Sequence, residues 1–381
     1  MKAVEFGVIG CGGRLRGLTQ SLLSNGGLRL RGVWDPEPEH CRMLLDAAKE
    51  GKCYASYREL VEDPEISWVL IGSPNACHKE HAVAAFENHK HVFCEKPLAT
   101  TIEDCVCMND MHGKSGSLFA TGFVLRYAPL YRKAKEILDS GKLGRVISID
   151  ANENISPNHG AYIMTNWRRD KSIAGPHILE KCVHDFDLLN WLTGSVPVRI
   201  AAFGGNDMWI PENADCMPRE IYCGWLSCKG ANCDQDNPFT SDKTIEDNVV
   251  AIMEYANGVR AQFQATMSNS IPERRMYFHC TRGNLVLELY TATLRYRAVD
   301  EEAEQVIVLK GDLHGGGDSR IMAELADSMK TGALPKCGGR EGLLSAVVGL
   351  TIDQARVEGK VIDLSPTWKK LGCHPQEGPQ A

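Results

Sequence analysis

Lys96 has the side chain and the local sequence needed to polarise an oxygen atom. It lies in the tripeptide Glu95-Lys96-Pro97, which directly follows the apolar run His91–Cys94. Such a run is typical of a short buried strand, so Lys96 would lie where that strand ends. A cation held at such a point can stabilise negative charge as it develops on an oxygen atom. A lysine exposed at a strand end, without a chemical role, is the alternative interpretation.

His184 is the residue best suited to exchange a proton with a hydroxyl group. Glu180 precedes it by four residues and Asp187 follows it by three, so a helix would place all three side chains on one face. A carboxylate one turn before a histidine can orient the ring and raise its basicity. The pattern therefore indicates a general base or acid. A helix histidine that serves only packing is the alternative.

A glycine-rich turn near the start of the chain is suited to bind a dinucleotide. The apolar run 4–10 is expected to be a strand, and Gly10-Cys11-Gly12-Gly13 leads from it into a helix. Backbone amides and the positive end of that helix would face a pyrophosphate, and a side chain at Gly10 or Gly12 would block its approach. An ordinary strand–helix turn would carry the same glycines.

Asp35, at the end of the second predicted strand, bears on which dinucleotide would bind. It follows Gly12 by 23 residues, the spacing expected of a carboxylate that accepts hydrogen bonds from ribose hydroxyls. A carboxylate there repels a 2′-phosphate and no arginine follows directly, which favours NAD over NADP. A turn-forming aspartate before Pro36 is the alternative.

Strands and helices alternate through the first third of the chain. This alternation predicts a doubly wound parallel sheet of the Rossmann type. The predicted strands are 4–10, 28–34, 68–71, 90–94 and 119–123, and the predicted helices are 14–25, 37–50 and 78–88. We therefore expect a dinucleotide-binding domain over residues 1–124.

Long strands predominate after residue 125. Runs of strands beside few helices indicate an α/β domain with a large open, mainly antiparallel sheet. The predicted strands are 145–154, 196–203, 248–255, 259–268, 276–280, 284–288, 293–297 and 304–309, and the predicted helices are 178–192, 318–330 and 340–358. We assign residues 125–368 to this substrate-binding and oligomerisation domain and residues 369–381 to a tail.

Composition restricts the function classes. The chain has 381 residues, a net charge of −7, 43% hydrophobic and 24% charged residues, and is long enough for two cores. The acidic balance argues against nucleic acid or an acidic membrane as a partner. No apolar run approaches the roughly 20 residues of a bilayer span, and the first residues lack signal-peptide architecture. A cytoplasmic protein is expected.

Fifteen cysteines are a high number for such a chain. Free thiols or a metal site are expected rather than a disulfide framework. Cys216, Cys223, Cys228 and Cys233 fall in the segment 204–247, which interrupts the strands as an insertion would. Their spacings differ from the two-residue pairs of zinc ribbons. We predict free cysteines in a lid loop and no metal, with a structural metal as the alternative.

The order and separation of these motifs resemble those of the Gfo/Idh/MocA oxidoreductases, the family of glucose–fructose oxidoreductase and inositol dehydrogenase. The resemblance covers nearly the whole chain and rests on the glycine turn, the Glu-Lys-Pro tripeptide and the helix that carries His184. It implies that Lys96 supplies the cation near the reacting oxygen and that the Lys96–Pro97 peptide is cis. Glu95 would anchor this loop or contact the nicotinamide ribose.

The resemblance also assigns residues to the two ligands. The segment Ser73–His78 matches the family's Thr-Pro-Asn-x-x-His loop beside the nicotinamide, although Asn75 also suits a simple turn and His78 a helix start. The expected NAD-binding residues are Gly10, Gly12, Gly13, Arg14, Asp35, Ser73, Pro74, Asn75, His78, Glu95, Lys96 and Pro97. The expected substrate-binding residues are Arg126, Tyr127, Asn154, His159, Trp167, Arg168, Asp187 and His314, each of which could equally be structural.

Some positions depart from the family's pattern. Leu15 stands where a third glycine is expected, so the helix would lie farther from the strand or the loop would run differently. Glu180 replaces an aspartate, and its longer side chain could contact a substrate hydroxyl instead of His184. Lys181 and Cys182 replace small residues, and Lys181 would point about 100° away from Glu180 around a helix.

These observations predict an NAD-dependent enzyme that transfers a hydride from a secondary hydroxyl of a sugar, cyclitol or glycoside to nicotinamide. Lys96 would polarise the oxygen, His184 would act as the base, and Glu180 would be a third catalytic residue. The alternative is an NAD-dependent glycosidase that works by transient oxidation, elimination, hydration and reduction. A non-catalytic regulator that binds the cofactor is a third interpretation. Family resemblance implies a homodimer or homotetramer through the open sheet.

Overall fold

The computed structural model describes residues 3–228, 237–311 and 313–373. The chain divides into two compact units, one formed by Met1–Tyr127 with Gly316–Ala346 and the other by Ala128–Gly315 with Val347–Ala381. The sequence predicted a single boundary after residue 124, whereas the first unit also takes in a late segment. That segment includes α12 (Gly317–Thr331), which packs against α1 (Gly13–Leu23). Residues 374–381 of the predicted tail lie outside the described residues, and Lys369 and Lys370 end the helix α14 (Ser365–Lys370).

The first unit contains a six-stranded parallel sheet in the order β3-β2-β1-β4-β5-β6. This order is that of a doubly wound dinucleotide-binding fold and confirms the predicted class. The strands are β1 (Val4–Ile9), β2 (Leu28–Trp34), β3 (Lys52–Cys53), β4 (Trp68–Ile71), β5 (His91–Cys94) and β6 (Phe119–Thr121). The further helices are α2 (Pro38–Ala48), α3 (Tyr57–Glu62), α4 (His78–Glu87) and α5 (Ile102–Ser115), with the 3-10 helices η1 (Asn75–Cys77) and η2 (Val124–Tyr127).

Helix α1 packs against the sheet without the third glycine of the dinucleotide-binding pattern. Leu15 occupies that position and is fully buried. Its partner on the sheet is Gly72, directly after β4, where an added Cβ would lie 2.4 Å from the Leu15 Cγ. In the family's pattern a glycine on the helix leaves room for close packing. Here Gly72, directly after β4, leaves that room instead, and helix and sheet approach closely.

The second unit contains a nine-stranded mixed sheet in the order β14-β13-β12-β11-β7-β10-β9-β8-β15. Neighbours are antiparallel except β7 and β10, which run parallel. The strands are β7 (Val146–Asn154), β8 (Pro197–Gly205), β9 (Asn248–Tyr255), β10 (Arg260–Thr266), β11 (Arg275–Cys280), β12 (Gly283–Glu288), β13 (Thr293–Ala298), β14 (Gln305–Val308) and β15 (Ile362–Asp363).

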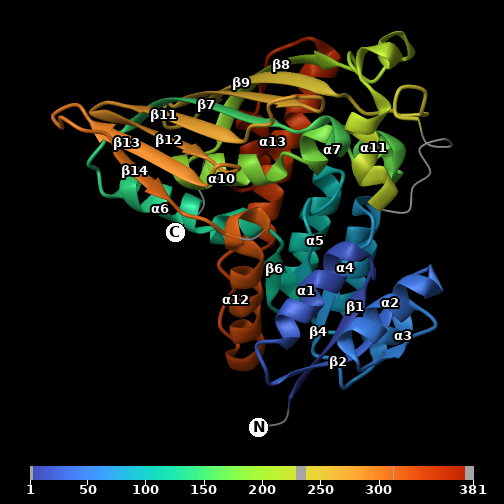
Figure 1. The fold of residues 1–381 in the computed structure, drawn as a ribbon. Coiled ribbons are helices and arrows are strands. Elements are labelled where there is room, and N and C mark those ends of the chain that lie inside the picture. The colour runs from blue at the N-terminus through green and yellow to red at the C-terminus, as the bar shows by residue number, and fades with distance from the viewer. Residues whose placement is uncertain (1–2, 229–236, 312, 374–381) are drawn as a thin grey trace. The chain divides into compact units, whose positions relative to one another are not determined.

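Helices cover one face of this sheet, with α6 and α10 lying along it (Figure 1). The other face alternates with the buried one along each strand, as in β9, where every second residue is exposed or half-exposed. The helices of this unit are α6 (Pro129–Asp139), α7 (Pro157–Thr165), α8 (Lys171–Ala174), α9 (His177–Glu180), α10 (Val183–Thr193), α11 (Arg219–Cys228) and α14 (Ser365–Lys370), with the 3-10 helices η3 (Trp167–Arg169), η4 (Pro211–Cys216) and η5 (Leu313–Gly316). Helix α13 (Gly339–Glu358) begins in the first unit and ends in the second.

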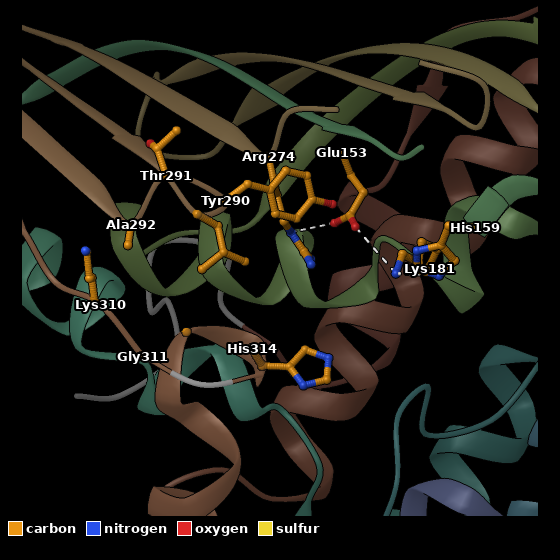
Figure 2. Close-up of a pocket in the computed structure, with 12 residues that line it drawn as sticks. Glu153, His159, Lys181, Arg274, Tyr290, Thr291, Ala292, Lys310, Gly311 and His314 are labelled. Atoms are coloured by element: carbon orange, nitrogen blue, oxygen red, sulfur yellow. Dashed lines mark hydrogen bonds and ion pairs between the residues drawn. The ribbon is translucent and has the colours of Figure 1, made fainter. Parts of the chain in front are cut away.

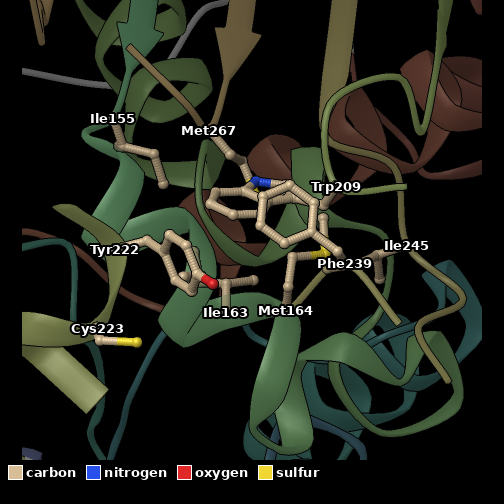
Figure 3. Packing of buried hydrophobic residues seen from close by; sticks show 10 residues of the cluster. Ile155, Ile163, Met164, Trp209, Tyr222, Cys223, Phe239, Ile245 and Met267 are labelled. Carbon is tan, nitrogen blue, oxygen red and sulfur yellow. The ribbon is translucent and has the colours of Figure 1, made fainter. Parts of the chain in front are cut away.

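The predicted insertion 204–247 has an apolar core of its own. Trp209 is fully buried, and its ring packs with those of Tyr222 and Phe239 at centroid distances of 6.0 and 4.9 Å (Figure 3). The cluster continues onto α7 and the residues after β7 through Met164 and Ile155. The described part of the insertion is therefore a packed subdomain over α7, which contradicts the prediction of a lid loop.

Two of the four cysteines of the predicted cluster have described side chains. Cys223 is buried in the apolar core of the insertion, and Cys216 is exposed. The side chains of Cys228 and Cys233 lie outside the described residues. Separately, no helix among the described residues combines the length and the hydrophobicity that a bilayer crossing requires.

Candidate active site

The glycine turn leaves open space where a dinucleotide would bring its phosphates. No atom lies within 4 Å of a Cβ added to Gly12 or Gly13, and α1 begins at Gly13 with its amides facing that space. Gly10 also has a role within the protein's own backbone. Its φ is +86°, and an added Cβ would lie 2.4 Å from the Ser73 nitrogen. The protein's own backbone therefore requires glycine at position 10, whereas Gly12 and Gly13 border open space.

Asp35 ties the glycine turn to the loop after β2. One carboxylate oxygen accepts a hydrogen bond from the Cys11 backbone nitrogen at 2.7 Å. The other accepts from the Glu37 nitrogen at 2.9 Å and lies 3.2 Å from the His40 Nδ1. The predicted turn-forming role is therefore present. Asp35 also lies at the end of β2, where the carboxylate that binds a ribose is found in dinucleotide-binding folds.

Arg14 joins three segments that surround the predicted cofactor site. Its Nε lies 2.7 Å from Glu95 Oε1, and its Nη1 lies 2.8 Å from Asp318 Oδ1. Glu95 is buried and also accepts from the Lys96 nitrogen at 3.2 Å. Arg14 is thus an ion-pair partner of protein carboxylates, and Asp318, which the chain order places far away, belongs to the same cluster.

His78 links the loop that contains Ser73 to the turn that contains Pro97. Its ring is fully buried, with Nδ1 2.9 Å from the Pro97 carbonyl oxygen and Nε2 2.9 Å from the Ser73 carbonyl oxygen. Burial lowers the pKa of His78, while its hydrogen bonds with these two carbonyl groups act in the opposite direction. His78 therefore contacts the backbone of both loops, and its predicted contact with the cofactor stays a prediction. Asn75 of the same loop is buried as well.

Lys96 lies at the carboxyl end of β5, as the sequence predicted. Its side chain is half-buried, and the Lys96–Pro97 peptide is cis. Gly122 follows β6 and approaches the same turn so closely that a Cβ would lie 2.8 Å from Glu95 Oε2. The carboxyl ends of parallel strands are where ligands bind in such sheets. The turn that holds Lys96 is therefore well ordered by its neighbours in the first unit.

In the second unit, the predicted helix 178–192 is broken. α9 ends at Glu180 and α10 begins at Val183, with Cys182 at ψ 2° between them. Glu180 and His184 are therefore not one turn apart on a continuous helix, and the prediction of a shared face was wrong for this pair. His184 and Asp187 both lie on α10 and are both buried.

Glu180 pairs with a residue that was predicted to bind substrate. Its Oε1 lies 2.9 Å from the Arg168 Nε. The Arg168 guanidinium also stacks over the Trp167 ring at 4.3 Å and lies 3.3 Å from the Tyr162 hydroxyl. The structure brings Trp167, Arg168 and Glu180 together, but as partners of one another.

His314 adopts a backbone conformation that is unusual for a residue with a side chain. Its φ is +54°, and the two glycines that follow also have positive φ. The centroid of its ring lies 6.2 Å from that of His184. A left-handed residue that is not glycine often marks a functional position. Here it places a second imidazole next to the predicted base.

A pocket of about 560 Å³ opens beside these histidines. Figure 2 shows its polar wall, in which Lys181 and Arg274 lie on either side of Glu153. His159 and His314, both predicted substrate-binding residues, are part of the lining. The complete lining is Glu153, His159, Lys181, Arg274, Leu289, Tyr290, Thr291, Ala292, Lys310, Gly311, His314 and Gly315.

The sequence missed most of the charged residues of this pocket. Glu153, Arg274 and Lys310 belong to no recognisable sequence motif. The one available signal is that Glu153 falls on the buried side of strand β7. Lys181 was noted but was expected to point away, because a continuous helix was assumed. The break before α10 makes that assumption invalid.

A buried ion network lies behind the pocket wall. Arg274 contacts Asp185 through Nε at 3.0 Å and Nη2 at 2.7 Å, and its Nε lies 2.5 Å from Glu153 Oε2. All three side chains are at most 5% exposed. Burial raises the pKa of the Asp185 carboxyl, although Arg274 lowers it. Burial, followed by the Lys181 ammonium, lowers the pKa of His159 to about 2, so this ring is neutral.

Other predicted substrate-binding residues make contacts within the protein. The Asn154 Oδ1 accepts a hydrogen bond from the Thr266 hydroxyl at 2.8 Å. The Tyr127 hydroxyl donates to Glu324 Oε1 at 2.7 Å within the first unit. Arg126 is buried in η2. For Asn154 and Tyr127 the geometry supports structural roles.

Comparisons with known proteins agree with this architecture. Residues 4–123 match the oxidoreductase family with an NAD-binding Rossmann fold, and residues 131–286 match the GFO/IDH/MocA C-terminal domain. The chain is 26% identical over 326 residues to 1,5-anhydro-D-fructose reductase of Ensifer adhaerens, covering 82% of this chain and 84% of that protein. It is 32% identical over 199 residues to inositol 2-dehydrogenase of Ralstonia nicotianae, covering 50% of this chain and 55% of that protein.

A solved structure shares the fold over almost the whole length. Levoglucosan dehydrogenase, in complex with NADH and levoglucosan, has a TM-score of 0.80, covers 95% of this chain and 100% of its own, and is 19% identical. The residues of the glycine turn fit the NAD-binding Rossmann domain that the family model describes. With matches over both units, the chain belongs to the Gfo/Idh/MocA family of NAD-binding oxidoreductases.

Proposed function

We propose that this oxidoreductase is an NAD-dependent dehydrogenase that acts on a secondary hydroxyl of a sugar, a cyclitol or a glycoside. The observation that carries the proposal is the polar pocket of the second unit, which lies beside His314 and so next to His184. A concave site with several convergent hydrogen-bonding groups suits a hydroxyl-rich ligand. Relatives named after sugar and inositol substrates support the same class.

Each of four residues would have a separate role in the hydride transfer. Bound NAD would supply the hydride acceptor. Lys96 would stabilise negative charge on the substrate oxygen, and His184 would take the hydroxyl proton. His314 would orient the substrate from its position next to His184, and Asp187, on the same helix face as His184, is the carboxylate suited to tune the base.

Glu180 is assigned a different task from the one predicted. Because it holds the Arg168 guanidinium at 2.9 Å, we propose that it positions Arg168 and the Trp167 ring at the substrate site. In this view Glu180 is a positioning residue rather than a third catalytic group.

A second candidate is the redox-neutral glycosidase, which rests on the same residues. Elimination and hydration need acid–base groups beyond the base for oxidation. Lys181 is such a group in the pocket, with its Nζ 3.4 Å from the His159 Nε2.

One assay tests both candidates. The protein would be incubated with NAD and a panel of inositols, free sugars and aryl glycosides, with NADH absorbance and aglycone release followed together. NADH formation without aglycone release supports the dehydrogenase, and aglycone release without net NADH supports the glycosidase. Lys96→Met and His184→Asn should each lower kcat by about 10²-fold or more, whereas exposed Lys114→Met should not. Unchanged kcat in either variant would refute its proposed role.

We also propose that a second copy of the chain covers the exposed face of the nine-stranded sheet. Phe203 on β8 is 73% exposed, and Val250 and Ile252 on the neighbouring β9 are 42% and 60% exposed. Contiguous exposed apolar side chains of this kind mark interaction sites. Light scattering of the wild type and of Ile252→Lys tests this, since a monomeric wild type would exclude it.

A further inference from the structure

The pocket of the second unit has an excess of cationic side chains. Three cations, Lys181, Arg274 and Lys310, line it, together with the imidazoles of His159 and His314. Glu153 is the one carboxylate among the described lining residues. A neutral sugar requires hydrogen-bond donors and acceptors but no such excess of one charge.

The carboxylate in the wall is already engaged by the protein. Glu153 is 1% exposed and lies between Arg274, at 2.5 Å, and Lys181, at 3.6 Å. Arg274 is further paired with Asp185 behind the wall. Arg274 is therefore paired with both buried carboxyl groups, and the cations that face the cavity are the lysines.

Lys181 is the cation best placed to meet a ligand. Its side chain is 18% exposed, and its Nζ lies 3.4 Å from the His159 Nε2, which accepts because that ring is neutral. The 3.6 Å separation from Glu153 is an ion pair rather than a hydrogen bond. An ammonium has three donors, so this arrangement can add a charge-assisted hydrogen bond to a ligand anion.

Lys310 lies across the cavity from Lys181. It is exposed, and Figure 2 shows it on the side of Thr291 and Ala292, opposite the wall formed by Glu153 and Arg274. A cavity of about 560 Å³ accommodates a monosaccharide with a substituent. The two lysines would therefore meet such a ligand from different sides.

We propose that the pocket binds a sugar that carries an anionic substituent, a carboxylate or a phosphate, with Lys181 as its main contact and Lys310 as a second. The inference deepens the proposed function by naming the substrate class, and rests on it only for the sugar part of the ligand. Arg274 holds the wall in place, and the anion itself is bound by the lysines.

Matched ligand pairs test the proposal by binding, independently of turnover. Titration calorimetry on the NAD-loaded full chain would compare glucuronate, glucose 6-phosphate and glucose, and then galacturonate with galactose. At least one anionic member should bind about tenfold or more tightly than its neutral partner at low salt, since a charge-assisted hydrogen bond has this effect. Tighter binding of glucuronate or galacturonate would identify the anionic substituent as a carboxylate, and tighter binding of glucose 6-phosphate would identify it as a phosphate. Equal affinities in every pair would overturn the proposal.

Lysine variants then locate the contact. Lys181→Met should lower the anionic-to-neutral affinity ratio by about fivefold or more, with Lys310 accounting for what remains, while the neutral sugar binds within about twofold of the wild type. Exposed Lys360→Met, in the same unit, is the matched control and should keep the ratio. Should Lys181→Met lower thermal stability, Lys181→Gln would replace it. An unchanged ratio in a folded Lys181 variant would overturn the assignment.

The two proposals fail in different ways. Anionic preference without any NADH formation or aglycone release from the anionic and neutral sugars would remove the proposed function and leave the anion site intact. Oxidation of neutral sugars alone, with equal binding of anionic and neutral sugars, would remove the anion site and leave the proposed function intact.

Discussion

The cofactor end of the first unit and the pocket of the second unit are built in different ways. In the first, the ligand-facing elements are backbone turns, such as those at Gly12 and Ser73, that follow strands of a parallel sheet. In the second, the wall consists of charged side chains from β7, the break between α9 and α10, and the residue before β11. A backbone site tolerates few residue types, whereas a side-chain site can change its ligand by single substitutions. We therefore expect single substitutions to change the ligand more readily in the pocket of the second unit than at the turns of the first.

The contacts that hold the two sites also differ. The first site depends on close approaches, such as Gly10 to Ser73, and on His78 between two carbonyl groups. The second depends on Arg274, which holds two buried carboxylates at once. Steric fit should dominate in the first unit and electrostatic pairing in the second, and each of the following changes tests one side of this contrast.

Removal of the Arg274 charge should have the largest effect. Arg274→Met leaves Asp185 and Glu153 buried with no guanidinium, which should lower the free energy of unfolding by about 3–5 kcal/mol. Chemical denaturation measures this loss, with exposed Arg297→Met as the control. A loss below about 1 kcal/mol would show that the second site does not depend on its ion network.

Two glycine substitutions separate steric fit from ligand fit in the first unit. Gly10→Ala should lower the free energy of unfolding by about 2–4 kcal/mol, because of the positive φ and the 2.4 Å approach to Ser73. Gly12→Ala should change stability by less than about 0.5 kcal/mol but raise the Kd for NAD about tenfold. Denaturation and NAD titration of both variants give the answer. A stable Gly10→Ala variant together with a destabilised Gly12→Ala variant that binds NAD normally would contradict these roles of the two glycines.

His81 should make the first unit sensitive to acid. Burial lowers the pKa of His81 to about 4, against about 6.5 when unfolded. The unfolded chain thus binds more protons between these values, and stability is lost as the pH falls from about 6.5 to 4. His81→Phe should remove up to about 3 kcal/mol of this pH dependence, since the Phe ring can pack against Trp34 and Tyr57. Parallel pH profiles of the unfolding free energy in both proteins would refute this.

Loss of the Arg14 ion pairs should have the smallest effect. Arg14→Met removes contacts with Glu95 and Asp318, but its side chain is one-third exposed, so a loss of only about 1 kcal/mol is expected. The Kd for NAD should rise a few-fold because the Lys96 turn loses a support. Arg16→Met is the matched control, since that guanidinium contacts the Met43 sulfur and not a carboxylate. An equal effect of both variants would show that the ion pairs contribute nothing.

Sequence reasoning succeeded where one local pattern decides the structure. The strand runs, the glycine turn and the position of Lys96 after β5 were all predicted, because each depends on neighbours in the chain. It failed at Glu180 and His184, where an assumed helix is broken and the side chains at the break pair with Arg168 and Glu153. Nor does the sequence pattern relate Leu15 to Gly72, the residue directly after β4 that leaves room for its side chain.

The sequence by itself determined the family, the doubly wound sheet and the NAD-binding turn, because hydrophobic periodicity and glycine spacing act over a few residues. Only the tertiary structure decided which charged side chains line the pocket. Glu153, Lys181, Arg274 and Lys310 come from separate elements, and no periodic signal relates residues so far apart. Their meeting depends on strand order, on the break before α10 and on ion pairing in a buried site, where the cost of an unpaired charge selects the partners.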